Sequence, residues 1–126
     1  IFDSMDIAQT EQLVVSALED IKAKDILVID SSRLSALFER VVIATGDSNR
    51  QTRSLAHHVA DKAREAGLEV IGIEGEGTGE WVLVDLGSIV IHIMQPAVRS
   101  HYNLEELWSA TPTRPSRPGS AAARAA

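Results

Sequence analysis

Residues 81–94 read WVLVDLGSIVIHIM, which is two alternating runs on either side of a Gly-Ser pair. A two-residue connection with glycine first favours a type II′ turn, so the stretch predicts a β-hairpin. The pairs that follow from this turn share one face: Leu86 with Ile89, Val84 with Ile91, and Val82 with Ile93. Because that face is wholly aliphatic, we expect it to lie in the hydrophobic core.

The opposite face of the hairpin mixes several chemistries: it carries Trp81, Leu83, Asp85, Val90, His92 and Met94. A tryptophan has a large apolar body and an N–H that needs a partner, so Trp81 is either a core anchor or an interface residue. Its place at the rim of a mixed face favours the interface. His92 either pairs diagonally with Asp85 or serves the same interface.

A βαβ unit precedes the hairpin. Val41–Ala44 is typical of a buried strand, and Ser48 with Gln51 forms an S-x-x-Q capping box that begins a helix. Apolar residues then repeat at helical spacing as far as Gly67, which suits the left-handed position after a helix end. Val70–Ile73 follows as the next strand. Strand, helix and strand in this order predict an α/β domain in which the two strands are parallel.

Upstream of this unit, Thr10 is a plausible N-cap for a first helix. The apolar stripe of that helix would be Val14, Leu18 and Ile21. Ile26–Ile29 is predicted to be a short strand.

Downstream of the hairpin, Pro96 suits the first turn of a helix that extends to about Tyr102, and Leu104–Trp108 closes the body with an amphipathic turn. Residues 111–126 alternate Pro, Ser, Gly, Ala and Arg, which predicts an unstructured tail. The length of 126 residues suits one domain. We therefore divide the chain into an N-terminal segment (1–9), a single domain (10–110) and a basic tail (111–126).

The charge of the chain is unevenly distributed. The whole chain has 12 Lys and Arg against 18 Asp and Glu, but three of the arginines lie in the acid-free tail, so residues 1–110 carry a net charge of −9. A domain this acidic argues against a protein that binds the phosphate backbone of nucleic acids or recognises a nucleic-acid sequence directly. A basic protein is the expected charged partner.

The chain has no cysteine, which excludes a disulfide framework, a thiolate nucleophile and a thiolate metal site. The longest apolar run, Ile89–Ile91, is too short to cross a bilayer, and no secretory signal is visible. We therefore expect a cytoplasmic protein without a membrane partner.

Two glycine-containing stretches invite a phosphate-binding interpretation. Glu74–Glu80 contains three glycines, but it leads into a strand, whereas a dinucleotide loop leads into a helix, so we interpret it as a flexible connector. Thr45–Ser48, between a strand and a helix N-terminus, is the better anion site. Metal-dependent nucleotidyl transfer would also need paired acids, and the natural strand for them offers only Asp85.

The remaining histidines suggest no catalytic site. His57 and Asp61 are four residues apart on the predicted second helix and could hold a metal, but a third ligand is not evident, so an exposed polar pair is preferred. His101 is expected on a helix surface. We accordingly predict no metal, no cofactor and no catalytic residue.

Taken together, several stretches resemble the ribosomal silencing factor family (RsfS), which is related to plant Iojap. The stretches are Val42-Ile43-Ala44-Thr45-Gly46, Ser48-x-Arg50-Gln51, Ala66-Gly67, Glu74-Gly75, residues 81–87, residues 90–94 and Tyr102-x-Leu104-Glu105-x-Leu107-Trp108. The resemblance spans about residues 10–109. Phe38 and Arg40, on either side of Glu39, depart from the family pattern, as does the basic tail.

The resemblance implies a mixed five-stranded sheet flanked by helices, similar to a nucleotidyltransferase core without its catalytic acids. It also implies a protein that is not an enzyme. Such a protein binds the large ribosomal subunit through the subunit's protein numbered fourteen, obstructs joining of the small subunit and reduces translation when nutrients fall, as in stationary phase. Many members are homodimers. The alternative function is a nucleotidyltransferase-like enzyme that uses Thr45–Ser48 and Asp85.

We predict the partner-binding surface on the mixed face of the hairpin. Its residues are Trp81, Asp85, His92 and Met94, with Glu76 and Glu80 on the rim. In the competing prediction a helix covers this face and the site lies at Tyr102–Glu106, with Tyr102 and Glu106 as contacts.

Overall fold

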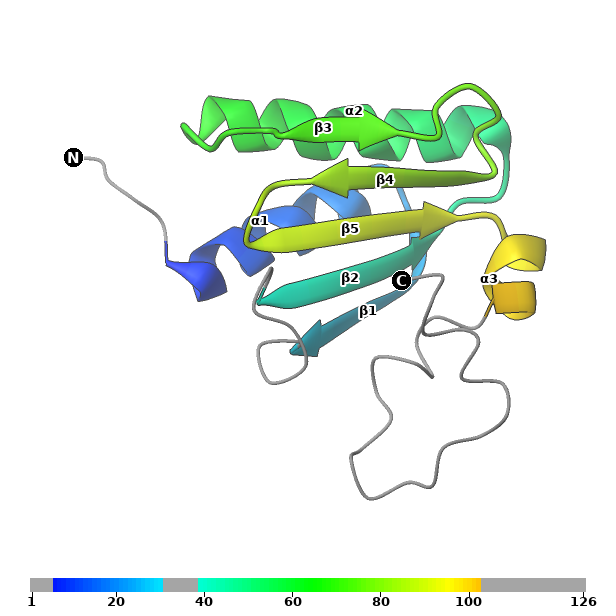
Figure 1. The fold of residues 1–126 in the computed structure, drawn as a ribbon, viewed down its shortest axis with the longest axis horizontal. Helices are drawn as coiled ribbons and strands as arrows, with labels where there is room; N and C mark the ends of the chain where they lie inside the picture. Colours follow the sequence, from blue (N-terminus) through cyan, green and yellow to red (C-terminus); the bar gives the residue numbers. More distant parts are fainter. Residues whose placement is uncertain (1–5, 31–38, 103–126) are drawn as a thin grey trace, which may run out of the picture.

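The computed structural model describes residues 6–30 and 39–102, which form a mixed five-stranded sheet flanked by helices (Figure 1). The elements are α1 (Ile7–Asp20), β1 (Lys24–Asp30), β2 (Arg40–Thr45), α2 (Asn49–Glu65), β3 (Gly72–Glu74), β4 (Trp81–Asp85), β5 (Ile89–Met94) and α3 (Pro96–Tyr102). This architecture confirms the predicted fold class. The predictions for Leu104–Trp108 and the tail lie outside the described residues.

The strand order is β1-β2-β5-β4-β3, and only the pair β2–β5 is parallel among the described strands. Two antiparallel steps separate β5 from β3, so β2 and β3 run in the same direction, as the βαβ pattern predicts. The two strands are not neighbours, however, because the β4–β5 hairpin lies between them.

The hairpin has the predicted register. Val84 lies opposite Ile91 and Val82 opposite Ile93. At the turn, the backbone N–H of Leu86 donates to the Ile89 carbonyl at 2.9 Å. Gly87 has a φ of +90°, the positive value that the first position of the predicted turn requires.

The core lies between the sheet and helices α1 and α2, which are behind the sheet in Figure 1. The aliphatic face of the hairpin belongs to this core, as predicted: Val82, Val84, Ile89, Ile91 and Ile93 are all fully buried. The helices contribute Val14, Leu18, Leu55 and Val59. At about 25 cal/mol per Å² of buried apolar surface, this layer supplies most of the driving force for folding.

Both helix starts are capped, but only the second begins where we predicted. The prediction of Thr10 as the first N-cap is wrong: the N-cap is Asp6, four residues earlier, because Asp6 and Gln9 form a reciprocal capping box. Thr10 is instead buried in the helix. In α2, the Ser48 hydroxyl accepts from the Gln51 N–H at 3.1 Å, which is half of the predicted capping box; the Gln51 side chain does not complete it, since its Oε1 accepts from the N–H of Asp47 at 2.7 Å.

The end of α2 also matches its prediction. Gly67 has a φ of +85°, and the N–H of Leu68 donates to the Ala63 carbonyl at 2.9 Å. This is the Schellman arrangement that glycine permits. Within the described part of the chain, no helix is long and apolar enough to span a membrane.

Candidate partner-binding surface

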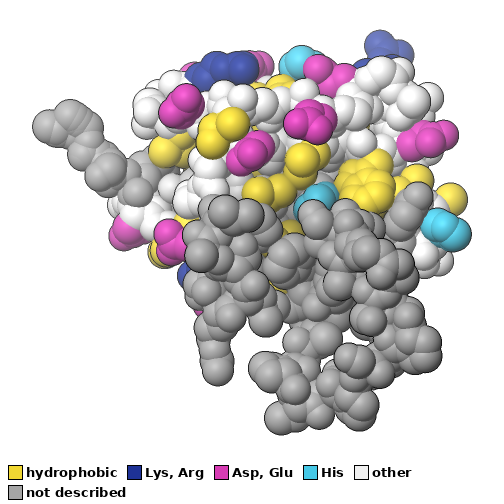
Figure 2. Space-filling view, in the orientation of Figure 1, with side chains coloured by type: hydrophobic (Ala, Val, Ile, Leu, Met, Phe, Trp, Pro, Cys, Tyr) yellow, Lys and Arg dark blue, Asp and Glu magenta, His cyan; other side chains and the backbone are white. Residues whose placement is uncertain are grey.

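The second face of the sheet carries the mixed set of side chains. Here α3 packs through Val98 against a small buried cluster near the carboxyl end of β5. Trp81 packs against the same cluster and stays partly exposed. Figure 2 shows hydrophobic side chains on this face beside a histidine, with Asp and Glu side chains around them. The face therefore combines an apolar centre with acidic surroundings.

Trp81 and His92 form a cross-strand pair at the centre of this face. The Trp81 indole Nε1–H donates to His92 Nδ1 at 3.0 Å, and the ring centroids lie 5.8 Å apart at 51°. Burial lowers the pKa of His92 to about 4, so the imidazole is neutral at pH 7 and carries its proton on Nε2. The bond satisfies the indole N–H while the ring remains available to a partner.

The lowered pKa of His92 predicts a pH-dependent stability. Between pH 6.5 and about 4, the unfolded chain protonates His92 and the folded chain does not, so the free energy of unfolding should fall as the pH falls. The loss from this residue is about 1.4 kcal/mol per pH unit at most. Urea unfolding of wild type and His92→Gln between pH 7.5 and 4.5 measures it. The variant keeps an acceptor for the indole and should lose this part of the slope; equal slopes in both proteins would contradict the assignment.

Two of the predicted contact residues have other roles. Met94 is fully buried in the cluster that it forms with Ile29, Val41 and Ile43, and Val98 of α3 packs against this cluster. Met94 therefore cannot contact a partner. Asp85 does not pair with His92, which was one of the two predicted roles. Its Oδ1 accepts from the N–H of Gly87 at 2.8 Å and thereby braces the hairpin turn.

Asp85 also lies at the far end of the face from Trp81. In the register, Asp85 is opposite Val90 and Trp81 is opposite Met94, four residues further along β5. At about 3.4 Å per residue this is roughly 13 Å. Trp81 and His92 therefore form the centre of the surface, with Asp85 on one border.

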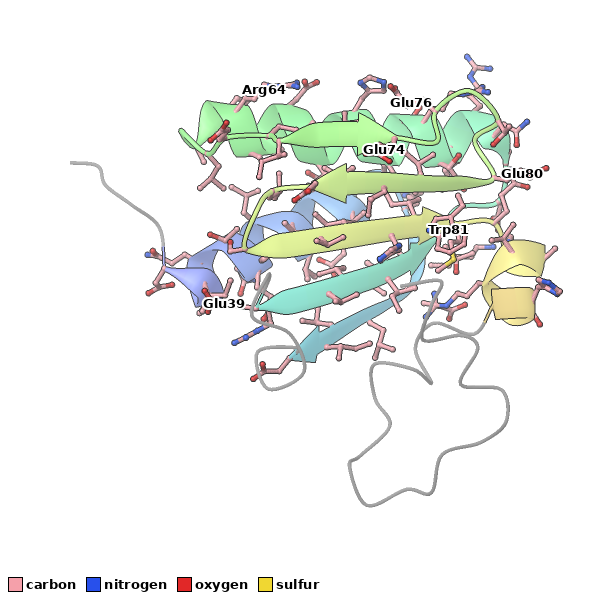
Figure 3. The ribbon with its side chains drawn as sticks, in the orientation of Figure 1. Glu39, Arg64, Glu74, Glu76, Glu80 and Trp81 are labelled. Carbon is pink, nitrogen blue, oxygen red and sulfur yellow. The ribbon has the colours of Figure 1, made fainter. Side chains whose placement is uncertain are left out.

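The acidic loop 74–80 joins β3 to β4; Figure 3 shows Glu80 near Trp81 at the start of β4, and Glu74 and Glu76 further out, at the end of β3 and beside α2. Glu80 is exposed, and the half-buried Glu76 carboxylate pairs with His57 of α2. The prediction of a plain flexible connector is wrong, because side chains of α2 bind the loop. Among them is Arg53, whose Nε donates to the Glu76 carbonyl at 2.7 Å.

The competing predicted site is only partly described. Tyr102 is the last residue of α3; its side chain and Glu106 lie outside the part of the chain that the structure describes. Helix α3 lies beside the end of β5 in Figure 1, and Trp81, which packs against the same cluster as Val98 of α3, stays partly exposed. A contribution of Tyr102 and Glu106 remains a prediction.

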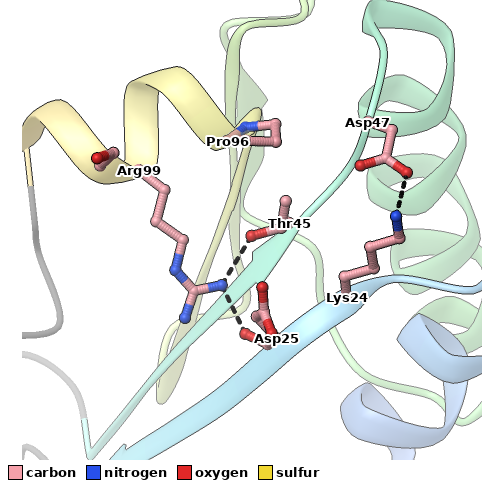
Figure 4. A pocket seen from close by; sticks show the side chains of 7 residues that line it. Lys24, Asp25, Thr45, Asp47, Pro96 and Arg99 are labelled. Carbon is pink, nitrogen blue, oxygen red and sulfur yellow. Dashed lines mark hydrogen bonds and ion pairs between the residues drawn. The ribbon is translucent and has the colours of Figure 1, made fainter.

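The residues of the alternative enzyme function are not brought together. Thr45 and Asp47 line a hollow at the carboxyl end of β2 with Lys24, Asp25, Pro96, Arg99 and Ser100 (Figure 4). Its two cationic side chains bond within the hollow: Lys24 Nζ is 2.8 Å from Asp47, and Arg99 Nη1 donates to Thr45 Oγ1 at 2.8 Å. Asp85 lies at the other end of the sheet, so the geometry does not assemble a site from Thr45–Ser48 and Asp85.

His57 and Asp61 are both exposed on α2, as predicted, but they bind different partners. His57 pairs with Glu76, whereas Asp61 lies 3.6 Å from Arg64 on its own helix. No group of three or more His, Asp or Glu side chains that could hold a metal occurs among the residues with described positions. His101 is exposed on α3, as predicted.

Sequence reasoning missed several polar contacts between elements. Arg40, which departs from the family pattern, lies 3.1 Å from Glu11 of α1 and 3.2 Å from Asp30 of β1. His58 Nε2 lies 3.0 Å from an Asp20 carboxylate oxygen and so joins α2 to α1. Arg40 is 29 residues from Glu11 and His58 is 38 residues from Asp20, and no local pattern could have indicated these two contacts.

Comparisons with known proteins agree on one family. The family described as "Ribosomal silencing factor during starvation" matches residues 4–126. A protein named Ribosomal silencing factor RsfS from Chromobacterium violaceum is 53% identical over 104 residues, which cover 82% of this chain and 85% of that protein. A crystal structure of a protein from the same organism has a TM-score of 0.82 at 50% identity and covers 90% of this chain and 93% of that one.

A more distant relative comes from mouse. The protein named Mitochondrial assembly of ribosomal large subunit protein 1 is 33% identical over 100 residues, which cover 77% of this chain and 44% of the mouse protein. The domain therefore occurs both in proteins of about this length and within longer ones.

Proposed function

This chain belongs to the ribosomal silencing factor family, and on that premise we propose that it binds the large ribosomal subunit and sterically blocks association with the small one. The contact is with the subunit's protein numbered fourteen. By blocking subunit association, this chain represses translation in the cytoplasm under nutrient limitation, such as stationary phase. It makes or breaks no covalent bond and needs no cofactor.

The observation that carries this proposal is the partly exposed Trp81–His92 pair on a sheet face whose other side is occupied by α1 and α2. An aromatic side chain set in a half-apolar surface is typical of the residues that dominate protein–protein binding energy. The name of the mouse relative, which refers to assembly of a ribosomal large subunit, supports the choice of subunit.

Electrostatics supports a protein contact over an RNA contact. The body carries a net charge of −9, which the phosphates of ribosomal RNA repel and a basic ribosomal protein attracts. Of the acids in the loop, Glu80 directly precedes Trp81 and lies near it in Figure 3, whereas the Glu76 carboxylate lies further out and pairs with His57 of α2. Long-range charge would then guide the approach, and the aromatic centre would hold the complex.

Size makes steric blocking feasible. A standard interface takes about 800 Å² from each partner, and the chain has 7162 Å² of accessible surface. Most of the molecule would thus remain outside the contact and obstruct the small subunit. A homodimer, which the resemblance implies, is compatible with this mechanism if it leaves the Trp81 face free.

The salt dependence of binding tests the proposed contact. We expect the affinity for purified large subunits, measured by co-sedimentation, to fall as salt increases. The double variant Glu76→Gln/Glu80→Gln should bind about tenfold more weakly at low salt, with a smaller salt slope.

The matched control is Glu65→Gln/Glu69→Gln, which removes two exposed acids near the other end of α2 and should bind within about twofold of wild type. An affinity that does not change with salt, or equal losses in both double variants, would contradict an acidic contact at the loop.

A further inference from the structure

We propose that Arg53 of α2 is a positioning residue that holds the acidic loop 74–80 in its partner-binding conformation before the partner arrives. This inference rests on the proposed function, because the loop supplies the acidic border of the proposed surface. Arg53 lies on the helix side of the loop and acts through the loop backbone.

The loop cannot fix its shape by itself. Its sequence, EGEGTGE, has three glycines and no apolar side chain that could pack against the domain. Glycine loses more backbone freedom on folding than any other residue, so this stretch is costly to order. Its defined conformation must therefore come from contacts with other elements.

Arg53 supplies the central contact. Its Nε donates to the Glu76 carbonyl at 2.7 Å, and its Nη2 donates to the Gly77 carbonyl at 3.0 Å. The rigid guanidinium fork thus spans two successive peptide groups, which the single ammonium of a lysine cannot do in the same way. Arg53 is half-buried, so water competes less with these bonds than at an exposed site.

Two other side chains of α2 bind the loop before and after the peptide groups that Arg53 contacts. One residue earlier, the hydroxyl of the fully buried Thr52 donates to the Gly79 carbonyl, which also accepts from Gln95 Nε2 at 3.1 Å. One turn later, His57 pairs with the Glu76 carboxylate. Arg53 lies between these contacts and binds the middle of the loop.

The loop is shaped to lie against the helix. Gly79 has a φ of +74°, and a Cβ added to it would lie 3.0 Å from Asn49 of α2. Its N–H donates to the Gly75 carbonyl at 3.1 Å, which closes the loop into a compact turn. The chain then enters β4 at Trp81.

The consequence is a preorganised border. The entropic cost of ordering the loop is met during folding, so it does not reduce the affinity for the partner. Without Arg53 the same acidic side chains are present, but the loop must be ordered at each binding event. Affinity should fall while the fold is retained.

We expect Arg53→Gln to bind large subunits about tenfold more weakly than wild type at low salt. Amide hydrogen exchange of residues 75–80 should become faster, and exchange in the core strands should not change. The control Arg64→Gln makes the same charge change on an exposed side chain at the far end of α2 (Figure 3) and should bind like wild type. Arg53→Lys keeps the charge, loses the fork and should also bind more weakly; it serves as the second variant if Arg53→Gln does not fold.

A double-mutant cycle separates positioning from other effects. In the Glu76→Gln/Glu80→Gln background, Arg53→Gln should weaken binding by less than about twofold, because there are no acids left to position. Wild-type affinity in Arg53→Gln, or the same tenfold loss in the background without the acids, would overturn the inference while leaving the proposed function intact. Failure of wild type to bind large subunits at all would refute the proposed function itself.

Discussion

Trp81→Ala is expected to weaken binding to the large ribosomal subunit by about a hundredfold, or about 2.7 kcal/mol. The indole is the largest apolar group of the proposed surface, and its N–H is already bonded to His92. A partner can therefore cover the ring without leaving a buried donor unsatisfied. Co-sedimentation with purified large subunits measures the loss.

Two variants control this prediction. Trp81→Phe keeps an aromatic ring and should recover most of the affinity, and Ile71→Ala, which truncates a side chain that is 59% exposed near β3, should bind like wild type. Because Trp81 is only partly buried, Trp81→Ala should remain folded, with a loss of about 1–2 kcal/mol in the free energy of unfolding. If the Trp81→Ala variant is unfolded instead, Trp81 is a core residue. If Ile71→Ala weakens binding and Trp81→Ala does not, the binding surface lies at the β3 edge.

Gly75→Ala should destabilise the fold by about 3–4 kcal/mol. Gly75 has a φ of +87°, and a Cβ at this position would lie 2.1 Å from the carbonyl oxygen of Trp81. That oxygen belongs to the backbone at the start of β4, so relief requires the loop and the strand to move apart. Urea unfolding at pH 7 measures the change.

Gly77→Ala is the matched control for this prediction. Gly77 lies two residues away in the same loop, but its φ is not positive and a Cβ there would meet nothing within 4 Å. Its substitution should change the free energy of unfolding by less than about 0.5 kcal/mol. Similar losses in both variants would mean that the loop does not approach β4 as described.

Local signals in the sequence predicted the central part of this fold. The Gly-Ser turn set the hairpin register, because a two-residue connection leaves one pairing and the side-chain alternation then assigns the faces. The ends of α2 were equally predictable, since Ser48 and Gly67 act through bonds to residues no more than five positions away. The mixed five-stranded sheet was implied by the family resemblance, and no signal in the sequence predicted the order of its strands.

The errors arose where two local signals competed or where the partner was distant in sequence. Asp6 and Thr10 could both have capped α1, and the reciprocal bond of Gln9 decides for Asp6. Asp85 could reach either His92 or the backbone of its own turn, and the nearer partner prevails. Arg53 carries no signal of its own, because its bonds to the loop span 23 and 24 residues.

The candidate site was predicted in part. Alternation placed Trp81 and His92 on one face, and the structure brings them together by a bond that the sequence did not suggest. The same alternation placed Met94 on this face too, but alternation does not predict which other elements pack over a sheet face. Met94 is in fact fully buried. Exposure depends on the tertiary packing of α3 and β1, which periodicity cannot reveal.

Subunit joining in the presence of saturating protein tests the central claim most directly. Purified large and small subunits are mixed with wild type or Trp81→Ala, and joined particles are followed by light scattering and gradient sedimentation. We predict that joining falls in proportion to the occupancy of the large subunit, and that the variant needs about a hundredfold more protein for the same effect. Normal joining while the large subunit is fully occupied would contradict the account.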